Sequence, residues 1–200
     1  MGTSCTCAYA TLYWAYMERK FIIPKWEQKL LLLCRFIDEK FGIWLGTRDE
    51  FNSFIIEINS YCQLQWTSEK TSTSVNFLDL TISIGKNRSV TTETFQKPIN
   101  LHLYISPHSA HPPEVLKSIV YGNLRRYWLQ NTNVEDYISI VKQFVSHLIA
   151  RGYNPNKIYD LFIQAANKLD RLITAKQHSD SDNNETVYLH WTWHPRCIKI

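Results

Sequence analysis

Apolar positions near the start of the chain follow a helical period. Between residues 8 and 21, apolar and aromatic side chains recur three or four positions apart, at Tyr9, Leu12, Tyr13, Tyr16 and Met17. This spacing predicts a helix with one buried face, and Thr3 or Ser4 stands where an N-cap is expected. A second helix is predicted over TRDEFNSFIIEINSYC, because Thr47 and Glu50 have the spacing of a capping box.

Strand-like patterns lie on both sides of that second helix. KLLLLCRFID, residues 29–38, predicts a strand, and FGIWLG predicts its hairpin partner, with the turn at Asp38, Glu39 and Lys40. QLQWTSE alternates weakly and is a further strand candidate. VNFLDLTISI, residues 75–84, alternates well and predicts one strand, with GKNRS as a turn and VTTETFQK as the returning strand.

The pattern changes after SPHSAHPP, and residues 112–175 are predicted to be almost entirely helical. Asn133 stands at a helix start, Gly152 ends that helix, and Pro155 opens the next one. After the polar tract KQHSDSDNNET, the segment VYLHWTWHP alternates as a final strand. We therefore expect an α+β protein, with a sheet unit up to about residue 105 followed by a bundle of about three helices.

Composition is that of a globular chain. The 200 residues are 44% hydrophobic and 20% charged, which excludes a disordered protein and allows a substantial core. Five cysteines with no C-x-x-C pair and no signal peptide indicate a reducing, intracellular compartment, cytoplasmic or nuclear. No apolar run reaches the roughly 20 residues needed to span a bilayer, so no membrane is expected as a partner. MGTSCT does match the N-myristoylation pattern, which would make a lipid-anchored scaffold.

Positive charge is concentrated in the helical part. The net charge is +4, and residues 114–176 hold nine Lys or Arg against five acids. A mild basic bias of this kind permits a nucleic-acid partner without requiring one. Arg125 and Arg126 are therefore either phosphate contacts or part of a solvated helix face.

The residues at the predicted hairpin tip have two interpretations. Asp38 and Glu39 either bind something positive, such as a metal ion, or are ordinary turn residues facing water. His108 and His111 have a spacing that could ligate a metal, but no third ligand lies near them in the sequence, so zinc is not expected.

Several segments, in order along the chain, resemble the palm and thumb of a reverse transcriptase, most closely those of Penelope-like and related retroelements. They are MGTSCTCAYATLYWAYME, RFIDEKFGIW, VNFLDLTISI, TETFQKPINLHLYI, SAHPPEVLKSIVYGNLRRY, LIARGYNPNKI and LHWTWHPR. The resemblance implies a partial palm, an antiparallel sheet with packed helices, over residues 1–105. It also implies a helical thumb-like bundle over residues 106–176, then a polar linker and terminal strand over 177–200.

The resemblance also implies a chemistry. It makes Asp38 a Mg²⁺ ligand and, with Glu39, a catalytic carboxylate of an RNA-directed DNA polymerase. The implied partner is an RNA/DNA template–primer duplex. The implied contacts with it are Gly2, Thr3, Ser4, Lys97, Arg125 and Arg126.

Three departures from the family pattern bear on activity. One lies in the turn near the template, where Cys7 stands in place of the family's Pro and Thr11 in place of its Asn. Glu39 replaces a second Asp, and the ammonium of Lys40, if it lies beside Asp38, would compete with a metal for that carboxylate. The other essential carboxylate of the family, with the fingers, precedes the Gly-Thr-Ser turn, and here Met1 coincides with the Met of that turn. We therefore expect this chain alone to be catalytically inactive. The alternative is a non-catalytic nucleic-acid-binding module.

Overall fold

The computed structural model describes residues 5–61, 65–179 and 197–198, with the side chains of the third helix of the bundle described as far as Arg171. The protein is α+β, as predicted, and its chain divides into two compact units. One unit holds the described residues up to Ser72 and a short strand near the C-terminus, and the other begins at Thr73. The predicted contacts Gly2, Thr3 and Ser4, and the final strand predicted over VYLHWTWHP, lie outside the described residues.

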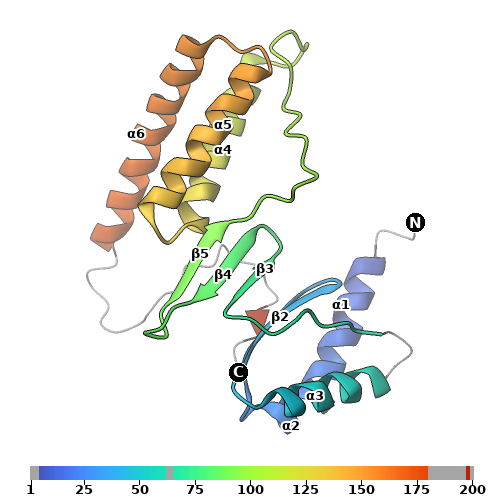
Figure 1. The fold of residues 1–200 in the computed structure, drawn as a ribbon. Coiled ribbons are helices and arrows are strands. Elements are labelled where there is room, and N and C mark those ends of the chain that lie inside the picture. The colour runs from blue at the N-terminus through green and yellow to red at the C-terminus, as the bar shows by residue number, and fades with distance from the viewer. Residues whose placement is uncertain (1–4, 62–64, 180–196, 199–200) are drawn as a thin grey trace. The chain divides into compact units, whose positions relative to one another are not determined.

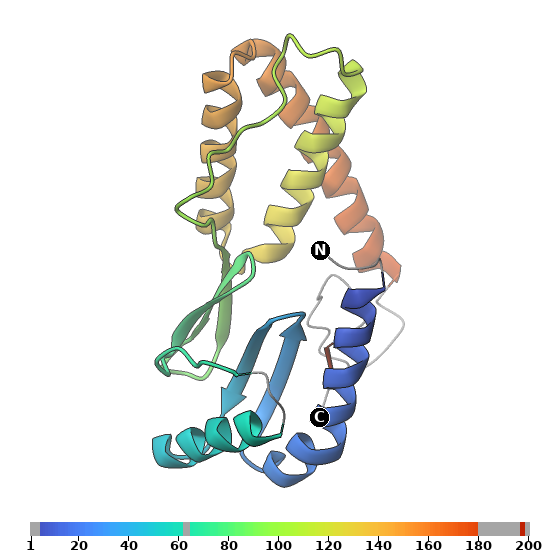
Figure 2. The ribbon, with the colours of Figure 1, turned by 90° about the vertical axis from the view of Figure 1, so that its right-hand side faces the viewer.

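The first unit is built around an antiparallel hairpin of β1 (Leu30–Phe36) and β2 (Glu39–Trp44), as the sequence predicts. The short strand β6 (Cys197–Ile198) pairs with the other edge of β1. Helices α1 (Thr6–Met17) and α3 (Arg48–Ser60) complete this unit (Figure 1). In Figure 2, α1 runs beside the hairpin.

The first helix does not end where its α-helical hydrogen bonds end. α1 continues through a π-helical turn, Glu18–Ile22, into the short helix α2 (Ile23–Trp26). The continuous helix thus covers the predicted range and passes beyond it. Its buried side chains meet those of α3 in an aromatic-rich core that contains Trp14, Met17, Ile22, Phe54 and Ile58.

The predicted capping box at the start of α3 is confirmed. The hydroxyl of Thr47 accepts the amide N–H of Glu50, and the Glu50 carboxylate accepts the Thr47 amide N–H at 2.8 Å. Two of the amide groups that a helix start leaves without partners are therefore satisfied. By contrast, the strand suggested by QLQWTSE is wrong, because the described residues 65–69 form no regular structure.

The second unit contains a three-stranded antiparallel sheet in the order β3 (Ser74–Phe77), β4 (Leu80–Ile84) and β5 (Val90–Thr94). The single strand predicted over residues 75–84 is wrong, because the chain reverses after Phe77 and pairs it with Leu80. Alternation of apolar residues continues across the turn, so the pattern contains no signal for the break.

Three helices follow the sheet, as predicted: α4 (Pro113–Gln130), α5 (Val134–Ala150) and α6 (Pro155–Ser179) (Figure 1). Gly152 has the positive φ, 102°, of a helix C-terminus, and the Asn154 side chain accepts two amides of the first turn of α6. The bundle core is formed by buried side chains that include Val120, Leu124, Tyr127, Phe144, Leu148 and Ile158.

Asn131, in the loop between α4 and α5, connects the bundle to the sheet. Its side-chain oxygen accepts the Thr94 amide N–H at 3.0 Å, and its side-chain nitrogen donates to the Thr94 hydroxyl at 2.8 Å and to the Tyr127 carbonyl at 2.7 Å. The backbone of the next residue, Thr132, donates to the Thr92 carbonyl. The loop therefore extends the edge of the sheet beside β5.

Candidate metal-binding hairpin and nucleic-acid surface

The β1–β2 hairpin turns through two residues, Ile37 and Asp38. Phe36 pairs with Glu39 and Arg35 with Lys40, so the predicted turn at Asp38, Glu39 and Lys40 is displaced by one position. Strand pairing continues to the last possible residue pair and draws Glu39 and Lys40 into β2. Asp38 stays at the tip, and both Asp38 and Glu39 are exposed.

Ile37 has a φ of 52°, in the left-handed region that β-branched residues avoid. Of the two central residues it alone has a positive φ, as in a type II′ turn, where glycine is normally found. A non-glycine residue in such a conformation costs about 1–3 kcal/mol and persists where the surrounding structure imposes it. The tip that carries Asp38 is therefore a strained and defined conformation.

The β3–β4 hairpin repeats this arrangement. Its two turn residues are Leu78, with a φ of 56°, and Asp79, which is exposed. Both tips thus read phenylalanine, an aliphatic residue at positive φ, and an exposed aspartate. They differ in the next residue, which is Glu39 in the first hairpin and an apolar leucine in the second.

A buried ion cluster lies directly beneath the first tip. Glu18 is 1% exposed, and the same carboxylate oxygen lies 2.8 Å from Arg35 Nε and 3.1 Å from Lys40 Nζ. These two cations face each other across the strands, one pair below Phe36 and Glu39. The π-helical turn that begins at Glu18 therefore holds both strands at the base of the tip.

The ammonium of Lys40 is enclosed by aromatic rings as well. It lies 4.2 Å from the ring centroid of Trp14 and 4.1 Å from that of Trp66, within the range of cation–π attraction. Two hydrogen bonds between the Asn59 side chain and the Trp66 backbone hold the second ring in place. The expectation that Lys40 competes for Asp38 did not anticipate this enclosure.

The tip offers oxygen donors of the type that Mg²⁺ prefers. Because side chains alternate along a strand, Glu39 and Lys40 point to opposite faces of the hairpin, so the Lys40 ammonium does not neutralise Glu39 from the same face. Mg²⁺ is commonly held by one or two carboxylates together with substrate phosphates. Asp38 and Glu39 fit that donor set. Among the described residues, no group of three His, Cys, Asp or Glu gathers at any place.

The outer surface of α4 carries basic and aromatic side chains in one stripe. Lys117, Tyr121 and Arg125 follow one another at four-residue spacing, and Trp128, 39% exposed, extends the line. Lys168 of α6 lies 4.6 Å from the centre of the Tyr121 ring. Helices α4 and α6 pack against each other in the bundle. We call the side chains Lys117, Tyr121, Arg125, Trp128 and Lys168 the α4 stripe.

Arg126 belongs to a different flank of α4. Successive residues are about 100° apart around a helix, so Arg125 and Arg126 cannot share one line. The guanidinium of Arg126 lies 3.8 Å from the Asp79 carboxylate at the second hairpin tip. The two arginines predicted as a pair are thus both exposed but face different surroundings.

The other predicted residues lie elsewhere in the second unit. Lys97 is exposed in the turn after β5, where its carbonyl accepts the amide N–H of Asn100. His108 and His111 are exposed in the loop before α4, and His111 Nδ1 shares a hydrogen bond with the Ser109 hydroxyl.

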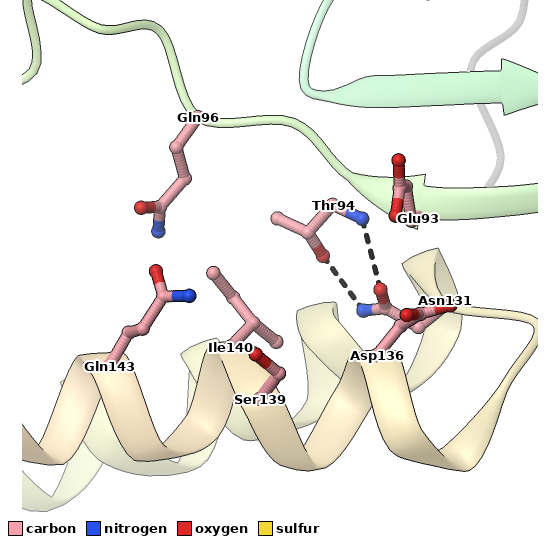
Figure 3. Close-up of a pocket in the computed structure, with 8 residues that line it drawn as sticks. All are labelled: Glu93, Thr94, Gln96, Asn131, Asp136, Ser139, Ile140 and Gln143. Atoms are coloured by element: carbon pink, nitrogen blue, oxygen red, sulfur yellow. Dashed lines mark hydrogen bonds between the residues drawn. The ribbon is translucent and has the colours of Figure 1, made fainter. Parts of the chain in front are cut away.

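A shallow pocket of about 160 Å³ lies between the end of β5 and α5 (Figure 3). Carboxylates of Glu93 and Asp136 and the amide side chains of Gln96, Asn131 and Gln143 line it. Asn131 is engaged there with Thr94, and Figure 3 draws both of these hydrogen bonds. The pocket lies where the Asn131 side chain joins the bundle to the sheet.

Sequence reasoning missed the ion cluster and most of the α4 stripe. Glu18 is 17 and 22 positions away from its two cations, so no local spacing signals their contact. The stripe could have been found, since Lys117, Tyr121 and Arg125 show helical spacing in the sequence itself. None of the helices described is long and apolar enough to cross a bilayer.

No family model, no curated protein and no solved structure matches this chain.

Proposed function

We propose that this chain is the later part of the palm, and the thumb, of a retroelement reverse transcriptase. In this proposal Asp38 is a Mg²⁺ ligand, and the second unit, which contains the three-helix bundle, binds the backbone of a template–primer duplex. The observation that carries the proposal is the first hairpin tip. It has an exposed Asp38 beside a strained Ile37, with the strands beneath held by buried Glu18.

Nucleotidyl transfer requires oxygen ligands at a fixed position. Bound Mg²⁺ would activate the primer hydroxyl and stabilise the leaving pyrophosphate. The protein's contribution is to hold the carboxylate of Asp38 where a nucleotide can reach it, with Glu39 supplying a second, neighbouring charge. A rigid tip suits this role because a displacement of about 1 Å is enough to cost such chemistry severely.

The α4 stripe supports the second part of the proposal. Contacts between Lys or Arg and phosphates supply most sequence-independent affinity for nucleic acid. Every Lys and Arg from Lys117 to Arg171 is exposed, and the ring of Trp128 is exposed in the same line. Such a surface favours a duplex or strand backbone over an apolar partner.

These 200 residues by themselves are expected not to polymerise DNA. In the family resemblance the other metal-binding carboxylate comes from an earlier palm motif, and that motif is not among them. A primer-extension assay with Mg²⁺, a primed RNA template and deoxynucleotides should show no incorporation. Robust incorporation would show that the second carboxylate has been misplaced.

The metal-binding role of Asp38 can be tested separately from polymerisation. Substoichiometric Mn²⁺ should broaden the amide NMR signals of residues 37–40, and Asp38→Asn should abolish this broadening. Asp79 is the matched control, because it occupies the same turn position without a neighbouring acid. Equal broadening at both hairpins, or at neither, would contradict a metal site at Asp38.

The second candidate function is a non-catalytic nucleic-acid-binding module, and the α4 stripe favours it independently of Asp38. It predicts that an RNA–DNA hybrid binds at low salt, that affinity falls steeply as salt rises, and that Arg125→Ala with Arg126→Ala weakens binding. Asp38→Asn should leave this binding unchanged if the module acts without a metal. Absence of binding at low salt would end both candidates.

A further inference from the structure

The guanidinium of Arg126 is held by three different groups. It lies 3.8 Å from the Asp79 carboxylate, donates to the Asn123 side chain at 3.1 Å, and lies 5.3 Å from the Tyr127 ring centre. Asn123 and Tyr127 belong to α4 itself, whereas Asp79 reaches it from the sheet. The only carboxylate among these contacts therefore comes from the tip of the β3–β4 hairpin.

The hairpin holds Asp79 in place. The turn places Leu78 at positive φ, and the Asp79 carbonyl accepts the amide N–H of Phe95, the residue after β5, at 2.8 Å. Its side chain is nevertheless 63% exposed, and that of Arg126 is 50% exposed. The ion pair is thus aligned by the backbone and open to solvent.

We propose that Asp79 competes with nucleic-acid phosphate for Arg126 and so lowers the affinity of the second unit for nucleic acid. This inference rests on the proposed function of that unit. A carboxylate and a phosphodiester present similar anionic oxygens to a guanidinium, so one replaces the other. While Asp79 is engaged, Arg126 is partly neutralised, and the exposed carboxylate also repels an approaching phosphate.

The strength of the pair sets the size of the effect. Exposed ion pairs are weak, so phosphate can displace Asp79 from Arg126. Asp79 therefore weakens nucleic-acid binding without preventing it. Removing the carboxylate should strengthen binding about two- to fivefold at low salt. The slope of log affinity against log salt should become more negative by at most about one, the change expected for one added phosphate contact. The reason is that Arg126 then engages phosphate fully.

Arg125 supplies the internal control. It lies on the same helix and is exposed, and among the described residues no carboxylate lies within ion-pair distance of it. Asp160 on α6 supplies a control for net charge, because it is exposed and no cation of the described part of the chain pairs with it. Asp160→Asn therefore removes one negative charge without releasing an arginine.

The test measures binding of the full 200-residue chain to a fluorescein-labelled RNA–DNA hybrid of about 20 base pairs by anisotropy, at several salt concentrations. Asp79→Asn should tighten binding, whereas Asp160→Asn should change it less. In the Arg126→Ala background, Asp79→Asn should bring no gain beyond that of Asp160→Asn. In the Arg125→Ala background, the full gain should remain.

The outcomes separate this inference from the proposed function. If the wild-type chain binds and Asp79→Asn acts no more strongly than Asp160→Asn, the competition is refuted while nucleic-acid binding stands. A gain that survives Arg126→Ala also refutes it, because the carboxylate then acts through bulk charge. If neither the wild-type chain nor Asp79→Asn binds the hybrid, both the inference and the binding function fail.

Discussion

The carboxylate of Glu18 accepts a hydrogen bond from the guanidinium of Arg35 at 2.8 Å, and both side chains are almost completely buried. Arg35 also donates to the Thr11 carbonyl of α1, so one guanidinium connects β1 to two points of the first helix. Lys40 lies 3.1 Å from the same carboxylate oxygen, so this one anion contacts a cation from each strand at the base of the hairpin tip.

Replacing Glu18 with Gln should destabilise the first unit strongly. It keeps an acceptor but removes the buried negative charge that Arg35 and Lys40 share. Breaking a buried pair in this way costs about 3–5 kcal/mol, measured as unfolding free energy in urea. Glu57→Gln is the control, since its partner Lys25 is 60% exposed and the loss should stay below about 1 kcal/mol. Equal losses would show that the cluster contributes little.

Strain at the first tip predicts an unusual response to glycine. Ile37→Gly should leave the protein equally stable or raise the unfolding free energy by about 1 kcal/mol, because relief of strain exceeds the entropy cost of glycine. Ile84→Gly is the matched control, because Ile84 is equally exposed, 37% against 36%, but lies in β4 without a positive φ. It should lose about 1 kcal/mol or more. Thermal and urea unfolding followed by circular dichroism would compare them, and a similar loss in both would contradict strain at Ile37.

Asn131 predicts how the sheet and the bundle of the second unit are coupled. Asn131→Ala removes three side-chain hydrogen bonds and should cost about 2–3 kcal/mol, with hydrogen exchange of the Thr94 amide accelerated tenfold or more. Asn133→Ala is the control. Its side chain caps no backbone group and contacts the Asp136 carboxylate instead, so little change is expected. Unchanged exchange at Thr94 would show that the backbone alone holds the loop to β5.

The stacked imidazoles of His102 and His147, 4.0 Å apart, make the second unit sensitive to pH. Burial, with a contribution from His102, lowers the pKa of His147 below its ordinary value near 6.5. The unfolded chain therefore binds a proton more readily than the folded one. The contribution of His147 to the free energy of unfolding is therefore complete above about pH 6.5 and is lost as the pH falls below that value.

This pH dependence can be assigned with two variants. Between pH 7.5 and 5.5, the unfolding free energy of the wild-type chain should fall, and His147→Gln should make that fall shallower. His111→Gln, at an exposed position, should leave the fall unchanged. The assignment to His147 fails if both variants behave alike.

Local signals predicted the elements that local interactions form. The capping box of Thr47 and Glu50, and the Asn154 cap of α6, join residues no more than three positions apart, so their spacing in the sequence is also their spacing in the structure. The tips could not be predicted in this way. Ile37 and Leu78 are poor turn residues by conformation, and strand pairing on either side imposes their positive φ.

The sequence by itself determined the α+β class, the three long helices, the hairpin with Asp38 at its tip, and the excess of positive charge on the helices. Helical period, caps and charge are local properties, and a single stretch of chain is enough to express them. Tertiary structure decided the anion beneath the hairpin, the enclosure of Lys40 by two tryptophans, and the ion pair of Arg126 with Asp79. Those depend on side chains brought together from distant positions, because burying a charge requires a partner that only the folded chain supplies.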